Sequence, residues 1–343
     1  MSDLQIQNPV IPPGSLILVT GANGFIASHV VDQLLAAGWR VRGTVRERKR
    51  TEWLSEHFDE KYGEGKFTTV EVPDISVSGA FEDAVQGISG VIHVASILTG
   101  DPDPNNVVTP LINSSLDLLK SAAKQADFKR FVLTSSSHAA AFPSYEKKVV
   151  VDETTFNIDA VSHAWAPPPY DVTRGGAVYA ASKVQAEQRI REWVKEHRPD
   201  IEVNTVLPSA NFGATLRKDH PGSVPWTWPF SLLEGKPEEV AVLSQYYIDV
   251  QDDARLHLAA LLLPDVKNDR ILGYAGVYTV NSLLAILRRQ FPEKKIIEDI
   301  PNEKVDLTQV QGSAKSEELL KTLGRLGWTT IEESIRLNLE GYP

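Results

Sequence analysis

The chain has 343 residues, of which 42% are hydrophobic and 23% charged, with a formal net charge of −10 and no cysteine. This length and composition are typical of a globular protein with a sizeable core, and the negative charge disfavours nucleic acid as a partner. Without cysteine, disulfides, thiol nucleophiles and thiolate metal sites are excluded. The longest apolar run, 256–264, is too short to span a bilayer, and the polar, Pro-rich N-terminal stretch lacks an apolar signal core. We therefore expect a cytoplasmic protein that binds neither membranes nor nucleic acid.

Residues 15–46 predict a strand, a helix and a second strand. A continuous apolar run at 16–19 is typical of a strand buried on both faces, and apolar residues recur at helical spacing after it. Gly38 is placed to end that helix, and the second strand is expected at 39–45. A right-handed parallel crossover needs about this length of chain.

Strands and helices continue to alternate after this first unit. Long helices are predicted at 110–126 and 179–197. Further strands are predicted at 67–72, 90–96, 130–136 and 202–208. The alternation indicates an α/β fold with a doubly wound parallel sheet of the Rossmann type.

The composition changes after residue 208. Residues 212–245 are rich in Pro, Gly and Trp. We expect them to form an irregular, aromatic-lined segment over the carboxyl edge of the sheet, where open α/β sheets bind their ligands. The prediction is a nucleotide-binding domain at 1–207 and a mostly substrate-binding, smaller α+β domain at 208–343, with elements at about 242–265 returning to the first.

The turn after the first strand carries Gly21, Gly24 and Ala27 at G-x-x-G-x-x-A spacing. The first glycine allows a tight turn, and the second lets backbone amides approach a pyrophosphate. The helix that begins near Phe25 directs its positive end at the phosphates. Between a buried strand and an amphipathic helix, this pattern predicts a dinucleotide site, with a tight turn that binds nothing as the alternative.

The end of the second strand bears on the choice between NAD and NADP. NAD sites usually carry an acidic residue there, which bonds the ribose 2′-hydroxyl. This chain instead has Arg46, followed by Arg48, Lys49 and Arg50, and a guanidinium favours the 2′-phosphate of NADP. For Lys49 a solvated helix start is an equal alternative. Asp74, after the third strand, is placed either to accept a hydrogen bond from the adenine amine or to cap a helix.

Two tyrosine–lysine pairs occur at a spacing of four, Tyr62 with Lys66 and Tyr179 with Lys183. Two glycines inside the first pair predict a turn, whereas the second pair lies in good helix composition and shares one helix face. A phenol has a pKa of about 10, and a nearby ammonium lowers that pKa. Tyr179 then becomes a general acid for a carbonyl oxygen, or a base in the reverse direction. Ordinary packing is the alternative.

Serines at the end of a predicted strand favour the catalytic interpretation. The stretch "LTSSS" at 133–137 ends at the same sheet edge as the glycine turn, where a hydroxyl donates to a substrate oxygen or merely caps the strand. The ordered set resembles the extended branch of the short-chain dehydrogenase/reductase superfamily. The stretches "VTGANGFIASHVV", "RFVLTSS", "YAASKVQAE" and "LGWTTIEESI" look most like fungal NADPH-dependent aldehyde/carbonyl reductases, relatives of plant dihydroflavonol reductases.

This resemblance implies a catalytic set and a cofactor. It implies Ser136 as the hydroxyl that polarises the carbonyl, Tyr179 as proton donor and Lys183 as its partner. It also implies NADPH, whose nicotinamide passes a hydride to the carbonyl carbon. The motifs and the resemblance together predict these cofactor-binding residues: Gly21, Asn23, Gly24, Phe25, Ile26, Arg46, Arg50, Asp74, Ile75, Val94, Ala95, Ser96, Leu133, Tyr179, Lys183 and Pro208.

The chain departs from the family pattern at two points. Ala27 stands where many extended members have glycine, and the catalytic asparagine of many members has no clear counterpart, because Asn113 is out of register. No metal-binding constellation is found among the eight histidines. His93, inside an apolar strand, is typical of a buried residue with its hydrogen bonds satisfied. His138 and His163 are possible pocket edges.

The expected activity is NADPH-dependent reduction of a small ketone or aldehyde to an alcohol, by a monomer or homodimer. Trp226, Trp228 and Phe230 suggest an apolar pocket wall, hence hydrophobic or aryl carbonyls, with core packing as the alternative. A sugar-nucleotide epimerase or dehydratase with bound NAD is a second candidate. It needs basic residues for a second pyrophosphate, and only Arg217 and Lys218 lie close together in the second domain. A non-catalytic NADP-binding redox sensor, the third candidate, has no need of the catalytic set.

Overall fold

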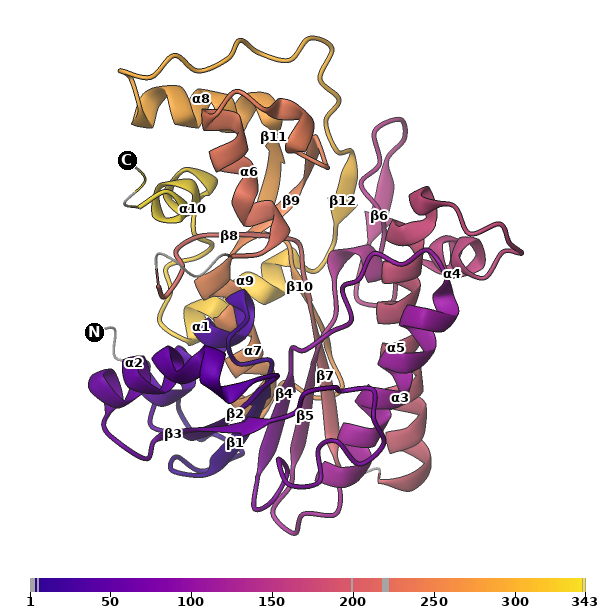
Figure 1. Ribbon diagram of the computed structural model, residues 1–343, viewed down its shortest axis with the longest axis vertical. Coiled ribbons are helices and arrows are strands. Elements are labelled where there is room, and N and C mark those ends of the chain that lie inside the picture. Colours follow the sequence, from indigo (N-terminus) through magenta and orange to yellow (C-terminus); the bar gives the residue numbers. More distant parts are fainter. Residues whose placement is uncertain (1–3, 5, 199, 218–221, 341, 343) are drawn as a thin grey trace.

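A computed structural model describes residues 4, 6–198, 200–217, 222–340 and 342 (Figure 1). Lys218 lies outside the described residues. The larger part is a seven-stranded sheet in the order β10-β7-β5-β4-β1-β2-β3, and all of its strand pairs are parallel. Its strands are β1 (Leu16–Thr20), β2 (Arg40–Val45), β3 (Phe67–Glu71), β4 (Gly90–His93), β5 (Arg130–Thr134), β7 (Glu202–Pro208) and β10 (Arg270–Gly273).

Helices cover both faces of this sheet (Figure 1). One face packs against α1 (Phe25–Ala36), α2 (Glu52–Tyr62) and α7 (Val250–Leu262), and the other against α3 (Pro104–Ala122) and α5 (Gly175–His197). Within β1 the buried side chains alternate, so that Ile17 and Val19 face the first set and Leu18 the second. The predicted α/β fold with a doubly wound parallel sheet is confirmed.

The strand order reverses between β1 and β4. From β1 the chain moves outward to β2 and β3, and from β4 it moves the opposite way to β5 and β7. The loops that leave β1 and β4 therefore diverge, and their divergence opens a crevice at the carboxyl edge, where such sheets bind ligands.

The smaller part lies above that edge in Figure 1. Its core contains apolar side chains from a three-stranded sheet and from the helices α6, α8 and α10. The elements are β8 (Ala210–Phe212), β9 (Ser244–Asp249), β11 (Gly276–Thr279), α6 (Val224–Leu233), α8 (Val280–Gln290) and α10 (Ile331–Asn338). The remaining elements are β6 (Val149–Val151), β12 (Thr308–Val310), α4 (Ile158–Ala164), α9 (Ser313–Thr322) and the short 3-10 turns η1 (Arg48–Thr51), η2 (Ser137–Ala139), η3 (Val172–Arg174) and η4 (Pro237–Glu239).

The chain passes between the two parts several times. β6 pairs with β12, a strand from the C-terminal region, and β9 of the small sheet leads directly into α7 on the large one. The elements that return to the large sheet are α7, which lies inside the predicted segment at about 242–265, and β10, whereas β9 belongs to the small sheet. The division into domains at 207/208 remains a prediction.

Two helices differ from the predictions. α3 begins at Pro104 instead of at 110, since the Asp103 side chain accepts a hydrogen bond from the Asn105 amide and caps the helix there. The stretch at 212–245 is not irregular throughout, because α6 forms with Pro229 in its interior. Burial of Trp228 in the small core offsets the hydrogen bond that Pro229 cannot donate.

The first tyrosine–lysine pair behaves as predicted. α2 ends at Tyr62, and Gly63 leaves the helix with a φ of +91°, so Lys66 lies outside it. The Tyr62 hydroxyl donates to Asp32 Oδ1 at 2.8 Å.

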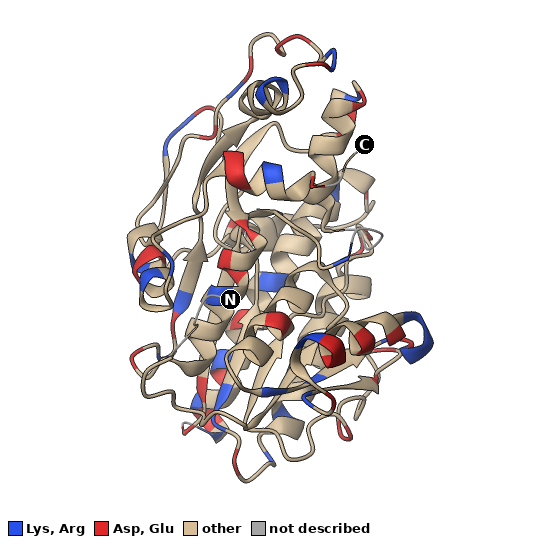
Figure 2. Ribbon diagram, turned by 90° about the vertical axis from the view of Figure 1, so that its left-hand side faces the viewer, with Lys and Arg blue, Asp and Glu red and all other residues tan. Residues whose placement is uncertain are grey.

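Acidic and basic positions are interspersed over the ribbon in Figure 2. In the part of the chain that the structure describes, no helix combines the length and the apolar character needed to cross a bilayer.

Candidate active site

The turn between β1 and α1 has the shape of a phosphate-binding turn. Gly21 has a φ of +66°, and a Cβ added there would lie 3.3 Å from Ala95 Cβ, so that glycine fits best. Gly24 precedes α1 and provides no capping side chain. The first amide groups of α1 are therefore free to bind a phosphate at the positive end of the helix.

The other predicted cofactor residues follow the carboxyl ends of neighbouring strands. Asn23, Phe25 and Ile26 lie in the β1–α1 turn or first helical turn, Arg46 and Arg50 follow β2, Asp74 and Ile75 follow β3, Val94, Ala95 and Ser96 follow β4, Leu133 is in β5, and Pro208 ends β7. They lie along a single edge of the sheet, except that the Leu133 side chain is buried in the core beside α3 and α5. Their role in binding a cofactor remains a prediction.

Hydrogen bonds join the ends of β1 and β4 beside the glycine turn. Thr20 Oγ1 accepts from the amides of Val94 and Ala95, both at 3.0 Å. Ser96 Oγ is buried, and within the described residues no partner bonds it. A buried hydroxyl without a partner fits a site that binds a polar ligand.

Among the arginines that follow β2, Arg48 and Arg50 bond other groups of the protein, and Arg46 is exposed. Arg48 donates to Glu71 Oε1 through its backbone amide and to the Thr69 carbonyl through its guanidinium, at 2.6 and 2.9 Å. The Arg50 guanidinium forms an exposed ion pair with Glu47 at 2.7 Å. Arg46 is exposed at the end of β2, which leaves its guanidinium available to an anion.

Asp74 closes a turn instead of capping a helix. Its Oδ1 accepts from the Ser76 amide and hydroxyl, at 2.8 and 2.6 Å, and the residues that follow are turns. These hydrogen bonds lower the pKa of the Asp74 carboxyl, and the nearby Arg46 lowers that pKa further.

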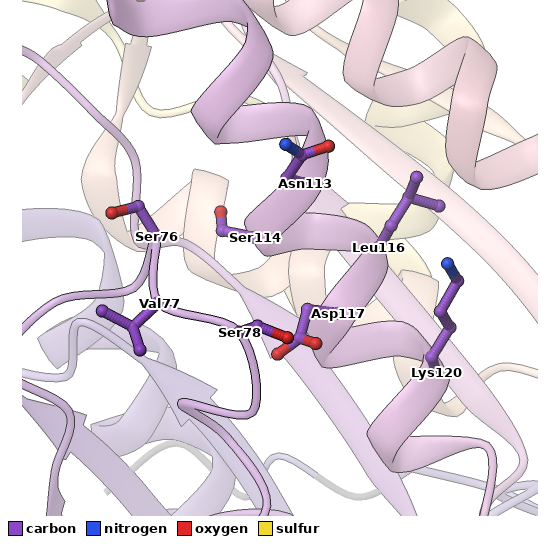
Figure 3. A pocket seen from close by; sticks show the side chains of 8 residues that line it. All are labelled: Ser76, Val77, Ser78, Asn113, Ser114, Leu116, Asp117 and Lys120. Carbon is purple, nitrogen blue, oxygen red and sulfur yellow. The ribbon is translucent and has the colours of Figure 1, made fainter.

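A pocket of about 300 Å³ lies between the 76–78 loop and α3, next in sequence to Asp74 and Ile75 (Figure 3). Its lining residues are Ser76, Val77, Ser78, Asn113, Ser114, Leu116, Asp117 and Lys120. Asn113 is thus in this pocket, whose lining does not include Ser136, Tyr179 or Lys183.

Ser136, Tyr179 and Lys183 meet where β5 ends. Tyr179 and Lys183 are one turn apart on α5, and the Tyr179 phenol contacts the Ser136 side chain. Lys183 Nζ donates to the Thr134 carbonyl at 3.0 Å and lies 5.9 Å from the centroid of the Tyr179 ring. Ser136 and Lys183 are buried. The structure brings the three predicted residues together, and their catalytic roles remain a proposal.

The pKa of Tyr179 is shifted in the direction opposite to the prediction. Burial raises the pKa of its phenol, and the contact with Ser136 offsets only part of that effect. The Lys183 ammonium donates its hydrogen bond to the Thr134 carbonyl. Burial also lowers the pKa of Lys183 to about 8, although Glu187 acts to raise it. At neutral pH Tyr179 keeps its proton, as an acid must.

His138 contacts Tyr179 and Ser136, and the sequence did not predict this contact. Its ring lies edge-on to the rings of Tyr179 and Phe142, with centroid distances of 6.3 and 5.1 Å, and its amide donates to Ser136 Oγ at 3.2 Å. Burial lowers the pKa of His138, and a hydrogen bond with Gln245 raises it in part. Only its position directly after the serines pointed to it.

The other two histidines singled out in the sequence lie elsewhere. His93 is buried and bonded to Thr20 Oγ1 at 2.8 Å and to Ser115 Oγ at 3.2 Å, which confirms the prediction of a satisfied core residue. His163 is an exposed residue of α4. The described ranges contain no group of three or more His, Asp or Glu side chains that could bind a metal ion.

The aromatic cluster of α6 belongs largely to the small core. Trp228 is 3% exposed and packs against the rings of Phe212 and Tyr278, as the core-packing alternative predicted. The rings of Trp226 and Phe230, with centroids 4.6 Å apart, are only partly buried.

Arg217 contacts the larger part of the molecule. Its guanidinium lies over the ring of Trp53, on α2, with 5.4 Å to the ring centroid.

Known proteins resemble the chain along most of its length. The model of the NAD dependent epimerase/dehydratase family matches residues 17–272. Aldehyde reductase 2 of Sporidiobolus salmonicolor is 39% identical over 335 residues, which cover 97% of each chain. The NAD-dependent epimerase/dehydratase terH of Aspergillus terreus is 37% identical over 339 residues, or 98% of this chain and 99% of that protein.

A solved structure of yeast methylglyoxal/isovaleraldehyde reductase Gre2 complexed with NADPH has a TM-score of 0.80 to this fold at 28% identity, over 95% of this chain and 97% of that one. The resemblance noted from the sequence motifs is confirmed by these matches. This chain belongs to the NAD dependent epimerase/dehydratase family, within the extended branch of the short-chain dehydrogenases/reductases.

Proposed function

We propose that this protein reduces ketones and aldehydes to alcohols with NADPH, and that Tyr179 donates the proton. The observation that carries the proposal is the contact of Tyr179 with Ser136, one helical turn from Lys183, at the sheet edge that also carries the glycine turn. The names of aldehyde reductase 2 and of the yeast reductase complexed with NADPH support it.

The residues at the carboxyl edge fit a dinucleotide. Gly21 allows close approach of a pyrophosphate, the uncapped start of α1 offers amide donors, and Ser96 Oγ has no partner among the described residues. We assign the 2′-phosphate to the exposed Arg46. NADPH, when bound, supplies the hydride that the carbonyl carbon accepts.

The protein's own groups would act on the carbonyl oxygen. The Ser136 hydroxyl donates a hydrogen bond to that oxygen and polarises the carbonyl. As the carbon gains its hydride, the oxygen takes the proton of the Tyr179 hydroxyl, which leaves a phenolate. The Lys183 ammonium stabilises the phenolate while that ammonium stays charged, below a pH of about 8.

Hydrophobic or aryl carbonyls are the proposed substrates. Trp228 is buried in the small core, so this proposal rests on the partly buried rings of Trp226 and Phe230. Apolar rings favour a substrate whose apolar surface is exposed to water in the free state and is buried on binding.

A panel of aromatic and aliphatic ketones and aldehydes tests the proposed function directly. With purified protein we expect oxidation of NADPH, followed by its absorbance, that depends on the carbonyl and is faster for aryl members. Tight binding of NADPH without turnover of any carbonyl would favour the redox sensor. Conversion of a nucleotide sugar by protein that retains NAD would favour the epimerase.

A further inference from the structure

Glu187 is a fully buried carboxylate one helical turn beyond Lys183 on α5. One of its oxygens accepts a hydrogen bond from the Ser135 hydroxyl, and the other accepts from Arg270 Nε at 2.7 Å. Arg270, in β10, is also buried and donates to the carbonyls of Glu153 and Thr155 at 3.0 and 2.7 Å. Desolvating two such charges is costly, and apolar residues of similar volume often stabilise a fold as well as a buried ion pair does. The pair is therefore weak evidence of a purely stabilising role.

Three residues of α5 contact three consecutive residues at the end of β5. Lys183 donates to the carbonyl of Thr134, Glu187 accepts from the hydroxyl of Ser135, and Tyr179 contacts the side chain of Ser136. Three consecutive residues are thus attached to three positions on one face of the helix, at i, i+4 and i+8. Ser135, which bonds Glu187, therefore lies between Thr134 and Ser136, the residues that contact Lys183 and Tyr179.

Few charged or titratable groups of the described residues surround this site, and one of them is His138, which contacts Tyr179 and whose pKa burial lowers. Tyr179 and Glu187 flank Lys183 on α5, and His93 faces it from β4 with a pKa that burial lowers to about 3, so it is neutral. His257 of α7 bonds Thr134 Oγ1 at 2.7 Å.

Glu187 itself faces cations. Besides Lys183, these are Arg191 of α5 and Arg270 of β10. Glu187 is the one carboxylate among the groups just named, and its charge favours the ammonium form of Lys183.

We propose that Glu187 is a positioning residue of the reductase: its charge keeps Lys183 an ammonium, and its bond to Ser135 fixes the strand end that presents Ser136 to Tyr179. The inference rests on the proposed roles of Tyr179 and Lys183. Glu187 was not identified from the sequence, although a carboxylate four residues after a lysine on a helix shares its face.

The test is the pH dependence of kcat/KM for a carbonyl at saturating NADPH, in Glu187→Gln and Glu187→Asp. Because the pKa of Tyr179 is raised, the first alkaline loss of activity in the wild type belongs to Lys183, near pH 8. Glu187→Gln keeps the shape and removes the charge, so the Lys183 pKa falls and the alkaline limb moves to lower pH, by roughly one unit. Glu187→Asp keeps the charge and shortens the reach to Ser135, so kcat falls while the limb stays closer to that of the wild type.

Glu192→Gln is the matched control. Glu192 is on the same helix, and its exposed ion pair with Arg189 at 3.0 Å is away from the catalytic set. Its profile should match that of the wild type. A wild-type alkaline limb in Glu187→Gln, or equal limbs in the Gln and Asp variants, would overturn the inference.

Two further measurements keep the test decisive. The ε-carbon NMR signal of Lys183, assigned by its loss in Lys183→Met, should titrate at lower pH in Glu187→Gln, and this readout does not need turnover. If Glu187→Gln does not fold, Ser135→Ala tests whether the bond to Glu187 fixes the strand end. The kcat should fall while the KM for NADPH is unchanged, and an unchanged kcat contradicts this part of the inference.

The failure of the proposed function and the failure of this inference are distinguishable. If Tyr179→Phe is active, the proposed function fails. If it is inactive and the Lys183 titration is unmoved in Glu187→Gln, only the role of Glu187 fails.

Discussion

Tyr179→Phe is expected to lower kcat for carbonyl reduction by about 10²- to 10⁴-fold, the contribution of a well-placed general acid. The phenylalanine ring fills the same space at the end of β5 but has no proton for the carbonyl oxygen. Binding of NADPH should remain close to that of the wild type, because the glycine turn and Arg46 are unchanged. Steady-state kinetics and a fluorescence titration of NADPH measure the two quantities.

Tyr62→Phe is the control for this substitution. It removes the same hydroxyl from a tyrosine that also has a lysine four residues later, but its phenol is bonded to Asp32 and its lysine is outside the helix. The control should reduce carbonyls at the wild-type rate. A Tyr179→Phe enzyme with wild-type kcat would rule out Tyr179 as the proton donor.

Arg46→Asp is expected to raise the KM for NADPH roughly tenfold to hundredfold and to improve the use of NADH. A charge-assisted hydrogen bond of a guanidinium with the 2′-phosphate is worth about 1.5–3 kcal/mol, and a carboxylate repels the phosphate but accepts from a 2′-hydroxyl. The ratio of kcat/KM for the two cofactors, with one carbonyl substrate, is the measurement.

Arg189→Asp is the control that separates a local effect of Arg46→Asp on cofactor preference from an effect of the changed net charge. It makes the same charge change at an exposed position of α5, and the ratio of NADPH to NADH use should not move. If Arg46→Asp leaves that ratio unchanged as well, Arg46 does not bind the 2′-phosphate.

The sequence predicted the large sheet and the placement of the site because both depend on local signals. The continuous apolar run of β1 identifies a strand buried on both faces, and Gly21 and Gly24 identify the turn that follows. Once the strands are parallel, residues that follow them must gather at one edge. This placed the serines at 135–137 beside the glycine turn, whereas the pairing of Ser136 with Tyr179, which lies on α5, came from the family resemblance.

The features that the sequence did not predict depend on tertiary contacts. α6 was missed because its prolines disfavour a helix locally, whereas burial of Trp228 stabilises the helix in the fold. The pKa of Tyr179 was predicted to fall because the spacing to Lys183 was visible, whereas the burial of the phenol, which raises that pKa, depends on the folded chain. The partner of Glu187 lies 83 residues away at Arg270, and no local pattern connects them.

The position of β10 in the chain has a consequence for synthesis and dissection of the protein. The large sheet receives its last strand only at Arg270–Gly273, after the chain has already formed β8 and β9 of the small sheet. A polypeptide that stops at residue 207 would lack α7 and would leave β7 as a bare edge, whose open amides and carbonyls invite pairing with another chain. We therefore expect a truncated nucleotide-binding half to aggregate during expression. During synthesis, the chain through Gly273 must emerge from the ribosome before the seven-stranded sheet can be completed.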